Sequence, residues 1–489
     1  MTHGRWLRGG SGRTAGGARP VVALALVGVL ALTAGACTGS GDPGSSRAGG
    51  FQPGADGVGD PYFPTYGNGG YDVANYALKV RYDPASDRLT GTATISATAT
   101  ANLSRFNLDL VGLTVSAVTV EGERAEFRHD EGELIVTPGR GLARDGRFTV
   151  EVTYDGVPEP VDSPDLGEGG FMATADGAVA LGQPESASTW FPVNDHPQDK
   201  ASYEIAVTVP EGLSALSNGV PGERSTAGGW TTWRWSERTP MASYLAMLVI
   251  GDYRVREGEH AGKPLVTAVA AGLPEGGPAE VSLNRTGEIA DFLATQFGPY
   301  PFEAYGGVAV SDRRIGYALE TQARPVYGPA FFTSGPNDSV VAHELAHQWF
   351  GDSVSVRRWS DLWLNEGFAT YAEWLWAQHD GGVTAQQAFD QGYAATDWSK
   401  PALDPGRSAL FGRPVYQRGA LAVHALRLTV GDEVFFRILK TWTAEKRNAS
   451  VVTGDLITVA ERVAGRPLGP LLDAWLSGTT APPPPPPVA

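Results

Sequence analysis

The sequence predicts an α+β fold in which a β-rich N-terminal half precedes a mostly helical C-terminal half. Three observations lead to this prediction: a length of 489 residues, period-two patterns before about residue 252, and helical segments beyond it. A single hydrophobic core rarely grows beyond about 300 residues, so a chain of this length is expected to form two domains. Its hydrophobic content of 42% and charged content of 19% are typical of globular proteins.

Residues 1–36 are expected to be an export signal peptide. Several arginines precede an apolar run over residues 21–32, which is too short for a comfortable transmembrane helix. Small residues follow, and then Cys37, the only cysteine of the chain. This order resembles a bacterial lipoprotein signal, so we expect the protein to be exported and held on the outer face of the cell membrane by a lipid on Cys37. The alternative is ordinary cleavage after Ala36 and secretion.

Two further segments have compositions that do not predict a packed core. Residues 37–70 are rich in Gly, Ser and Pro and are expected to form a lipoprotein-type tether, and residues 479–489 are expected to form a Pro-rich tail. The net charge of −16 repels phosphate groups. Nucleic acid is therefore not an expected partner.

Residues 71–252 are expected to form an antiparallel β domain. Every second residue from Tyr76 to Tyr82 is apolar, and residues 91–100 alternate Thr or Ser with Ala or Ile. Such alternation places apolar side chains on one face of a sheet.

Residues 253–478 are expected to form a second, mostly helical domain. Helical segments are predicted over the ranges 279–297, 339–350, 361–379, 418–428 and 455–476.

A pair of histidines in the second half predicts a metal site. Residues 343–347 read His-Glu-Leu-Ala-His on a predicted helix. Residues four apart share one helix face, so His343 and His347 can bind the same zinc ion. Glu344 lies next to them, where its carboxylate can act as the general base toward an attacking water.

A zinc site also needs a ligand from another element, and Glu366 stands on the next predicted helix with eighteen residues between it and His347. It lies within an Asn-Glu-Gly-Phe-Ala sequence. This arrangement resembles the aminopeptidase N family of zinc peptidases, which includes the leukotriene hydrolases, in a short bacterial form. The resemblance implies that His343, His347 and Glu366 hold one zinc ion per chain.

The resemblance extends over most of residues 71–478 and implies a thermolysin-like catalytic domain, with the site in the cleft between the two domains. Family landmarks are matched, in the expected order, by residues 190–195, 240–245, 297–302 and 415–419. In the last of these, Tyr416 is expected to donate a hydrogen bond to the oxyanion of the tetrahedral intermediate. Glu373, seven residues after Glu366, is expected to orient a zinc-binding imidazole.

The resemblance also implies a site for the amino terminus of a peptide substrate. Gln183 and Glu185 match a glutamine-x-glutamate segment of the family, and Glu320 matches the glutamate of its Gly-x-Met-Glu-Asn segment. This chain departs from the second pattern, because residues 316–321 read Gly-Tyr-Ala-Leu-Glu-Thr. The glutamate contact is retained, while the backbone contacts of that segment are in doubt.

Together these expectations describe a zinc-dependent aminopeptidase that acts on peptides. The nearest alternative is a zinc metalloendopeptidase, which uses the same metal chemistry without holding the amino terminus. An epoxide hydrolase, by analogy with the leukotriene hydrolases, is a further alternative. The last is a catalytically inactive cell-surface binding protein on the same fold, although such a protein has no chemical reason to keep the ligands, Glu344 and Tyr416 intact.

Overall fold

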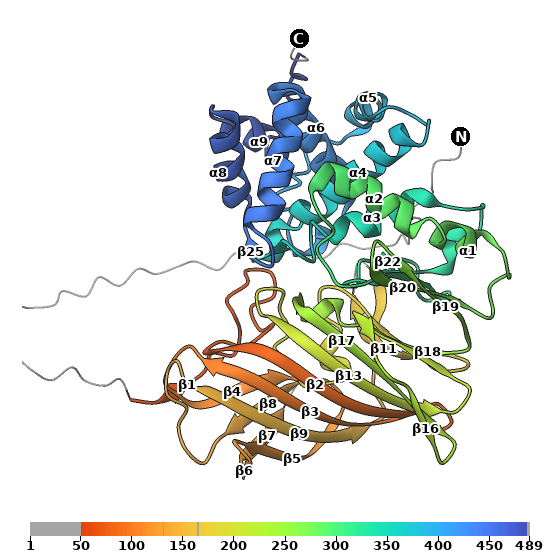
Figure 1. Ribbon diagram of the computed structural model, residues 1–489. Coiled ribbons are helices and arrows are strands. Elements are labelled where there is room, and N and C mark those ends of the chain that lie inside the picture. The colour runs from red at the N-terminus through yellow and green to blue at the C-terminus, as the bar shows by residue number, and fades with distance from the viewer. Residues whose placement is uncertain (1–49, 131, 164–165, 487–489) are drawn as a thin grey trace, which may run out of the picture. The chain divides into compact units, whose positions relative to one another are not determined.

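The computed structural model describes residues 50–130, 132–163 and 166–486. The predicted signal peptide and Cys37 lie outside the described residues. Figure 1 shows a β-rich region in the first half of the chain and a group of helices in the second, which confirms the predicted α+β fold. Within the described ranges, no helix combines the length and the apolar character needed to cross a bilayer.

The β-rich region is built on a long sheet whose centre is the antiparallel pair β2 and β3. Buried and more exposed side chains alternate along both strands, as their period-two sequences predict. Within this sheet all neighbouring strands run antiparallel except β2 and β13, which run parallel. In spatial order the strands are β15 (Val220–Pro221), β17 (Trp230–Ala242), β13 (Lys200–Pro210), β2 (Tyr71–Asp83), β3 (Arg88–Ala99), β9 (Arg147–Gly156), β5 (Thr114–Val120) and β6 (Glu123–Arg124), and β16 (Ser225–Ala227) also pairs with β17.

Two smaller sheets complete the β-rich region. The first has the order β1 (Gln52–Pro53), β4 (Leu103–Asp109), β8 (Glu133–Thr137) and β7 (Glu126–Asp130). The second has the order β10 (Val161–Ser163), β11 (Gly167–Ala173), β12 (Ala178–Leu181), β18 (Leu248–Gly251) and β14 (Ser214–Leu216). Because β12 ends at Leu181, the residues that follow it, Gln183 and Glu185, are presented on a loop at the end of the central strand of this sheet.

The second half of the chain begins with a further sheet, directly after the predicted boundary at residue 252. Its order is β19 (Tyr253–His260), β20 (Lys263–Ala270), β21 (Tyr305–Ala309), β23 (Val326–Tyr327) and β22 (Ala318–Leu319). The end of β22 places Glu320, its next residue, at this sheet's edge. A separate short pair joins β24 (Ser355–Val356) to β25 (Ser450–Val451).

The helices gather in one group (Figure 1), and the first two of them lie between β20 and β21 in the sequence. They are α1 (Pro278–Leu283), α2 (Thr286–Phe297), α3 (Asp338–His347), α4 (Trp363–His379), α5 (Ala385–Ala395), α6 (Gly419–Val430), α7 (Asp432–Glu445), α8 (Thr453–Ala464) and α9 (Gly469–Leu476).

Two of the predicted helices are each divided in the structure. The prediction of one continuous helix over 279–297 is wrong, because the chain breaks between α1 and α2 at Asn284 and Arg285. The segment 455–476 is likewise α8 and α9, and α8 ends at Gly465, which adopts the left-handed conformation with φ +67°. In each case both helices turn their apolar side chains toward the same core. The apolar spacing of the sequence therefore continues through the break, although the helix does not.

Residues 50–70 pack against the folded chain, although their composition suggests a tether. Asp60 is 3% exposed and accepts hydrogen bonds from the backbone N–H groups of Tyr62, Phe63 and Trp359. The hydroxyl of Tyr62 donates to Asp404. The part of the predicted tether that the structure describes is therefore packed on the fold, since β1 pairs with β4 of the β-rich region and Asp60 and Tyr62 contact the helical half.

The helices α4 and α6 cross at a contact between two glycines. A Cβ atom added to Gly419 would lie 2.8 Å from the Cα of Gly367, and one added to Gly367 would lie 2.8 Å from the Cα of Gly419. Side-chain carbons do not approach other atoms this closely, so the two backbones touch only because both residues lack a side chain. Gly367 directly follows Glu366, and the crossing therefore sets the position of that carboxylate.

The variant Gly419→Ala is expected to force α6 away from α4 and to lower the free energy of unfolding by about 1–3 kcal/mol. Urea denaturation measures this change. Gly454→Ala in α8 is the matched control, because a Cβ there meets no atom within 4 Å. It should be neutral or slightly stabilising, since alanine restricts the unfolded chain. Equal stability of the two variants would contradict the close crossing.

Candidate active site

The two histidines of the predicted metal site stand on α3. The helix begins at a cap in which the side-chain oxygen of Asn337 accepts a hydrogen bond of 3.2 Å from the backbone N–H of Val340. His343 and His347 follow one turn apart, with ring centroids 4.9 Å from each other. The spacing of four residues therefore places both imidazoles on one face of the helix, as the sequence predicts.

Glu366 reaches the same point from α4. Its Oε2 lies 3.4 Å from the Nε2 of His343 and 3.4 Å from the Nε2 of His347. Ligand atoms bound at about 2.0–2.1 Å to one tetrahedral ion are separated by about 3.4 Å. Two imidazole nitrogens and one carboxylate oxygen with these separations fit a zinc ion, and they are the residues that the sequence predicts as its ligands.

The other nitrogen of each imidazole has a hydrogen-bond acceptor that fixes its orientation. The Nδ1 of His347 lies 3.0 Å from the carbonyl oxygen of Phe350, and the Nδ1 of His343 lies 2.7 Å from Oε1 of Glu373. Because both oxygens act as acceptors, each Nδ1 carries the hydrogen and each Nε2 keeps its lone pair for a metal. Glu373 thus contacts the imidazole of His343, a predicted zinc ligand.

Two more carboxylates lie beside the three predicted ligands. Glu344 is 4% exposed and Glu320 is 2% exposed. One oxygen of each lies within 4.8 Å of the other and of a ring nitrogen of His347. Burial raises the pKa of Glu320, since removal from water disfavours the charged carboxylate.

Glu320 joins the β domain to the helical domain. Its Oε1 accepts a hydrogen bond of 2.9 Å from the hydroxyl of Tyr244 and one of 3.3 Å from the side-chain amide of Gln183. Both donors come from the β-rich half of the chain. The candidate site therefore lies where the two domains meet, as the family resemblance implies.

Glu185 is placed two residues after Gln183 and has a different partner. Its Oε1 accepts a hydrogen bond of 2.5 Å from the hydroxyl of Tyr66. Burial raises the pKa of Glu185 to about 7, while the hydrogen bond from Tyr66 acts in the opposite direction. Glu185 and Glu320 are thus each held by a tyrosine hydroxyl.

Tyr416 lies beside the histidines on a short π-helical turn, Pro414–Arg418, which leads into α6. Its ring stacks on that of His343 with an interplanar angle of 19° and a centroid distance of 6.1 Å. Single π-helical turns occur frequently at functional sites, because they redirect side chains that a regular helix would turn elsewhere.

Two tyrosines of the site are not identified by the sequence reasoning. Tyr244 lies within residues 240–245, a segment that resembles a family landmark. The resemblance therefore marks the segment, but it does not indicate what Tyr244 does. Tyr66 lies in a Gly- and Pro-rich stretch with no periodicity, and nothing in the sequence connects it with Glu185. Only the fold brings Tyr66 and Glu185 together, across 119 positions of the chain.

A cavity of about 370 Å³ opens next to Glu185. Gln183 and Glu185 line it together with aromatic and basic side chains, among them Phe63, Tyr66, Tyr317, Arg407 and Phe411. It combines apolar walls with a few polar groups, which is the usual composition of a small-molecule or peptide subsite.

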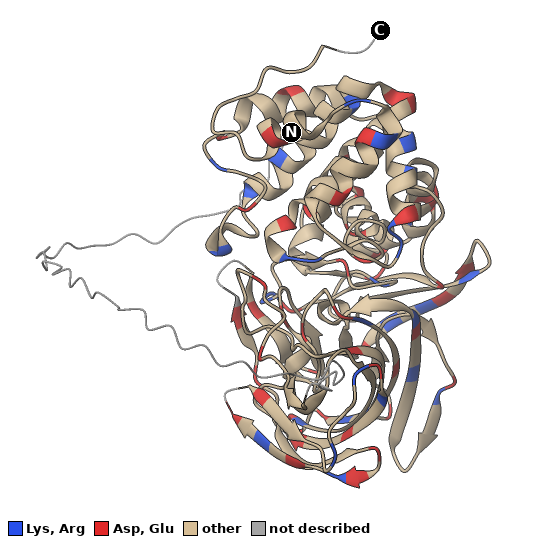
Figure 2. Cartoon of the chain, turned by 90° about the vertical axis from the view of Figure 1, so that its left-hand side faces the viewer, with Lys and Arg blue, Asp and Glu red and all other residues tan. Residues whose placement is uncertain are grey.

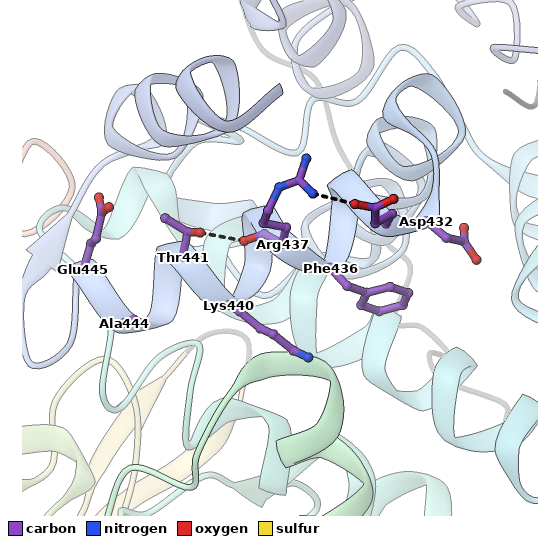
Figure 3. Close-up of a pocket in the computed structure, with 8 residues that line it drawn as sticks. Asp432, Phe436, Arg437, Lys440, Thr441, Ala444 and Glu445 are labelled. Carbon is purple, nitrogen blue, oxygen red and sulfur yellow. Dashed lines mark hydrogen bonds and ion pairs between the residues drawn. The ribbon is translucent and has the colours of Figure 1, made fainter. Parts of the chain in front are cut away.

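A second hollow of about 750 Å³ follows the exposed side of α7 (Figure 3). All of its lining residues belong to that helix, and the exposed ion pair between Arg437 and Glu433 crosses it. Exposed charged side chains on one helix provide no converging polar groups, so this hollow does not compete with the cluster around His347 as a catalytic site. Acidic and basic residues are interspersed over both halves of the chain (Figure 2).

The variant Glu373→Ala is expected to weaken zinc binding by about 10- to 100-fold, because His343 loses the acceptor that orients it. Competition with a chromogenic chelator measures the affinity. Glu433→Ala is the control, since Glu433 lies exposed on α7 and forms a surface ion pair with Arg437. Identical zinc affinity in the two variants would remove Glu373 from the support of the metal site.

Both halves of the chain match known sequence families. Residues 73–245 match the Peptidase M1 N-terminal domain, and residues 281–475 match the Peptidase family M1 domain. Aminopeptidase N of Acetobacter pasteurianus is 30% identical over 322 residues, which cover 61% of this chain and 88% of that protein. Aminopeptidase M1 of Arabidopsis thaliana is 26% identical over 444 residues, which cover 82% of this chain and 49% of that protein. The chain thus spans about half the length of the curated relatives it matches most extensively.

Solved structures agree with these matches. The crystal structure of a mutant M1 zinc metallopeptidase from Deinococcus radiodurans, bound to a Tyr-Ser-Ala substrate, is similar with a TM-score of 0.81 and 34% identity, over 88% of this chain and 100% of that one. A second structure of the Deinococcus protein gives the same TM-score of 0.81 and 34% identity, over 88% and 99% of the two chains.

Proposed function

The chain belongs to peptidase family M1, and from this premise we propose that it is a zinc-dependent aminopeptidase, which hydrolyses the N-terminal peptide bond of peptides. The observation that carries the proposal is the convergence of His343, His347 and Glu366 beside two buried carboxylates, Glu344 and Glu320. The three predicted ligands supply the metal site. The two further acids supply a base and an anchor for a cationic substrate group.

His343, His347 and Glu366 would hold the zinc ion through the atoms that face one another. When bound, zinc polarises the scissile carbonyl group and makes water a stronger acid. Glu373 and the carbonyl of Phe350 keep the imidazoles in the orientation that this binding requires.

Glu344 is the general base of the proposed reaction. It follows His343 on α3, and its carboxylate is buried next to the predicted ligands. It accepts a proton from the attacking water as the water oxygen forms a bond to the carbonyl carbon. It then returns this proton to the leaving nitrogen as the carbon–nitrogen bond breaks.

Tyr416 is the proposed donor to the carbonyl oxygen, which gains negative charge during the attack. Its position beside His343 supports this role, because the ring is held against a predicted zinc ligand. A donor fixed in advance stabilises the developing charge without having to reorganise during the reaction.

The acids Glu320 and Glu185 favour an aminopeptidase over an endopeptidase. Both are withdrawn from water, and a buried carboxylate remains costly unless a positive charge balances its own. The free α-ammonium group of a peptide supplies such a charge. By binding it, the two acids would hold the first peptide bond over the predicted ligands.

Peptides with a free amino terminus are therefore expected to be cleaved at least about a hundredfold more efficiently than their N-acetylated forms, because each lost charged hydrogen bond weakens binding by roughly 1.5–3 kcal/mol. The ratio of the two kcat/KM values measures this selectivity. Glu320→Gln should reduce it together with overall activity. Comparable cleavage of both forms, or cleavage mainly at internal bonds, would instead identify a metalloendopeptidase.

We also propose that the protein is exported and anchored to the outer face of the cell membrane through a lipid on Cys37. The order of arginines, apolar run, small residues and cysteine in the first 37 residues supports this proposal. Peptides outside the cytoplasm would then be its substrates.

Replacing Cys37 by serine in the full-length chain should move the protein from the membrane fraction to the soluble fraction, because the lipidated side chain is lost. Detergent phase separation and immunoblotting of cell fractions measure the change. A wild-type protein that is already soluble would identify secretion as the correct alternative.

A further inference from the structure

The segment from Asp60 to Tyr66 lies outside both ranges that match the peptidase family, 73–245 and 281–475. Phe63 and Tyr66 nevertheless line the cavity of about 370 Å³ beside Glu185. A part of the chain that the family match does not include thus contributes side chains to the proposed peptide site.

Tyr66 touches the carboxylate that the proposed function assigns to the amino terminus of the substrate. Its hydroxyl donates to Oε1 of Glu185 at 2.5 Å. A hydrogen bond to a charged acceptor is among the stronger ones in proteins, and it fixes the direction in which the carboxylate points. The contact therefore determines which way Glu185 faces a ligand.

Several contacts hold Tyr66 in this position. Its ring stacks on Phe63 with centroids 4.6 Å apart, and its backbone N–H donates to the Phe63 carbonyl at 3.1 Å. The guanidinium of Arg407 lies 4.7 Å from the centre of the Phe63 ring. Asp60 secures the start of the segment through its hydrogen bonds with backbone N–H groups, including that of Trp359. Tyr66 thus reaches Glu185 from a fixed support.

We propose that Tyr66 is a positioning residue for the substrate's amino terminus, and that its hydroxyl orients the Glu185 carboxylate to accept a hydrogen bond from the α-ammonium group. This inference rests on the proposed aminopeptidase function. It adds a residue from outside the matched ranges to the machinery that selects a free amino terminus.

The charged groups around Glu185 determine how removal of the Tyr66 hydroxyl changes the pKa of this carboxylate. Burial raises the pKa of Glu185 and so does the nearby Asp195, whereas Tyr66 and Arg407 lower it. Asp162 is the other acid that lines the cavity with Glu185. Without the Tyr66 hydroxyl, the pKa of Glu185 rises further, so more of it is protonated at neutral pH and cannot pair with an ammonium group. The loss of substrate binding that follows from removing the hydroxyl is therefore larger at lower pH and smaller at higher pH.

The variant Tyr66→Phe tests the proposal, because it keeps the ring that stacks on Phe63 and removes only the hydroxyl. For a peptide with a free amino terminus, KM at neutral pH should rise about tenfold, while kcat changes less than about twofold. The KM defect should shrink as the pH is raised. Zinc content and the slow cleavage of the N-acetylated peptide should stay at wild-type values.

Tyr62→Phe is the matched control, with the same chemical change in the same segment. The hydroxyl of Tyr62 contacts Asp404 and the backbone N–H of Gly406. This variant should lose thermal stability without a change in KM. If both variants raise KM equally, or if Tyr66→Phe leaves KM unchanged, Tyr66 has only a structural role and the inference is overturned.

A double-mutant cycle with Glu185→Gln separates the proposed role from a general loss of stability. In the Glu185→Gln background, removal of the Tyr66 hydroxyl should change KM less than about twofold, because the oriented carboxylate is already absent. A full tenfold effect in that background would contradict the proposal. If the wild-type enzyme itself cleaves free and N-acetylated peptides equally, the proposed function and this inference both fail. If the wild-type enzyme is selective and Tyr66→Phe keeps the same selectivity, only the inference fails.

Discussion

Three carboxylates are buried around His347, and the need to balance their charge is the constraint on which the site depends. Glu320, Glu344 and Glu366 are 2%, 4% and 3% exposed, and each has an oxygen within 4.8 Å of a ring nitrogen of that histidine. Burying this much negative charge in one place is costly unless cations are brought to it. A zinc dication and the ammonium group of a substrate are two such cations, so this charge distribution supports the proposed metallo-aminopeptidase function.

The fold brings these acids together by packing helices on a sheet and then adding donors from the β domain. The ligands come from α3 and α4, and the contact of Gly367 with Gly419 sets how α4 lies against α6. The β domain contributes Gln183 and Tyr244, which both donate to Glu320. The domains must therefore stay in contact for Glu320 to keep its partners, and the peptide site depends on that interface more than the metal site does.

Most of the metal site could be predicted from the sequence, because its geometry is local. The spacing of His343 and His347 fixes their common face on a helix, and the third ligand follows from the family resemblance. What the sequence does not reveal depends on contacts between distant residues. Tyr66 meets a carboxylate 119 positions away, and no periodicity marks it. The break before α2 is also hidden, since apolar spacing continues across Arg285 although the helix does not.

The most direct test of the account is the paired measurement of zinc content and turnover in Glu344→Gln. An amide keeps the size of the side chain and leaves all three predicted ligands in place, but it cannot accept a proton. The variant should hold about one zinc per chain, as the wild type does, with kcat lowered by roughly a hundredfold or more. Undiminished turnover, or a loss of zinc equal to that of His343→Ala, would contradict the role of Glu344 as the base beside an independent metal site.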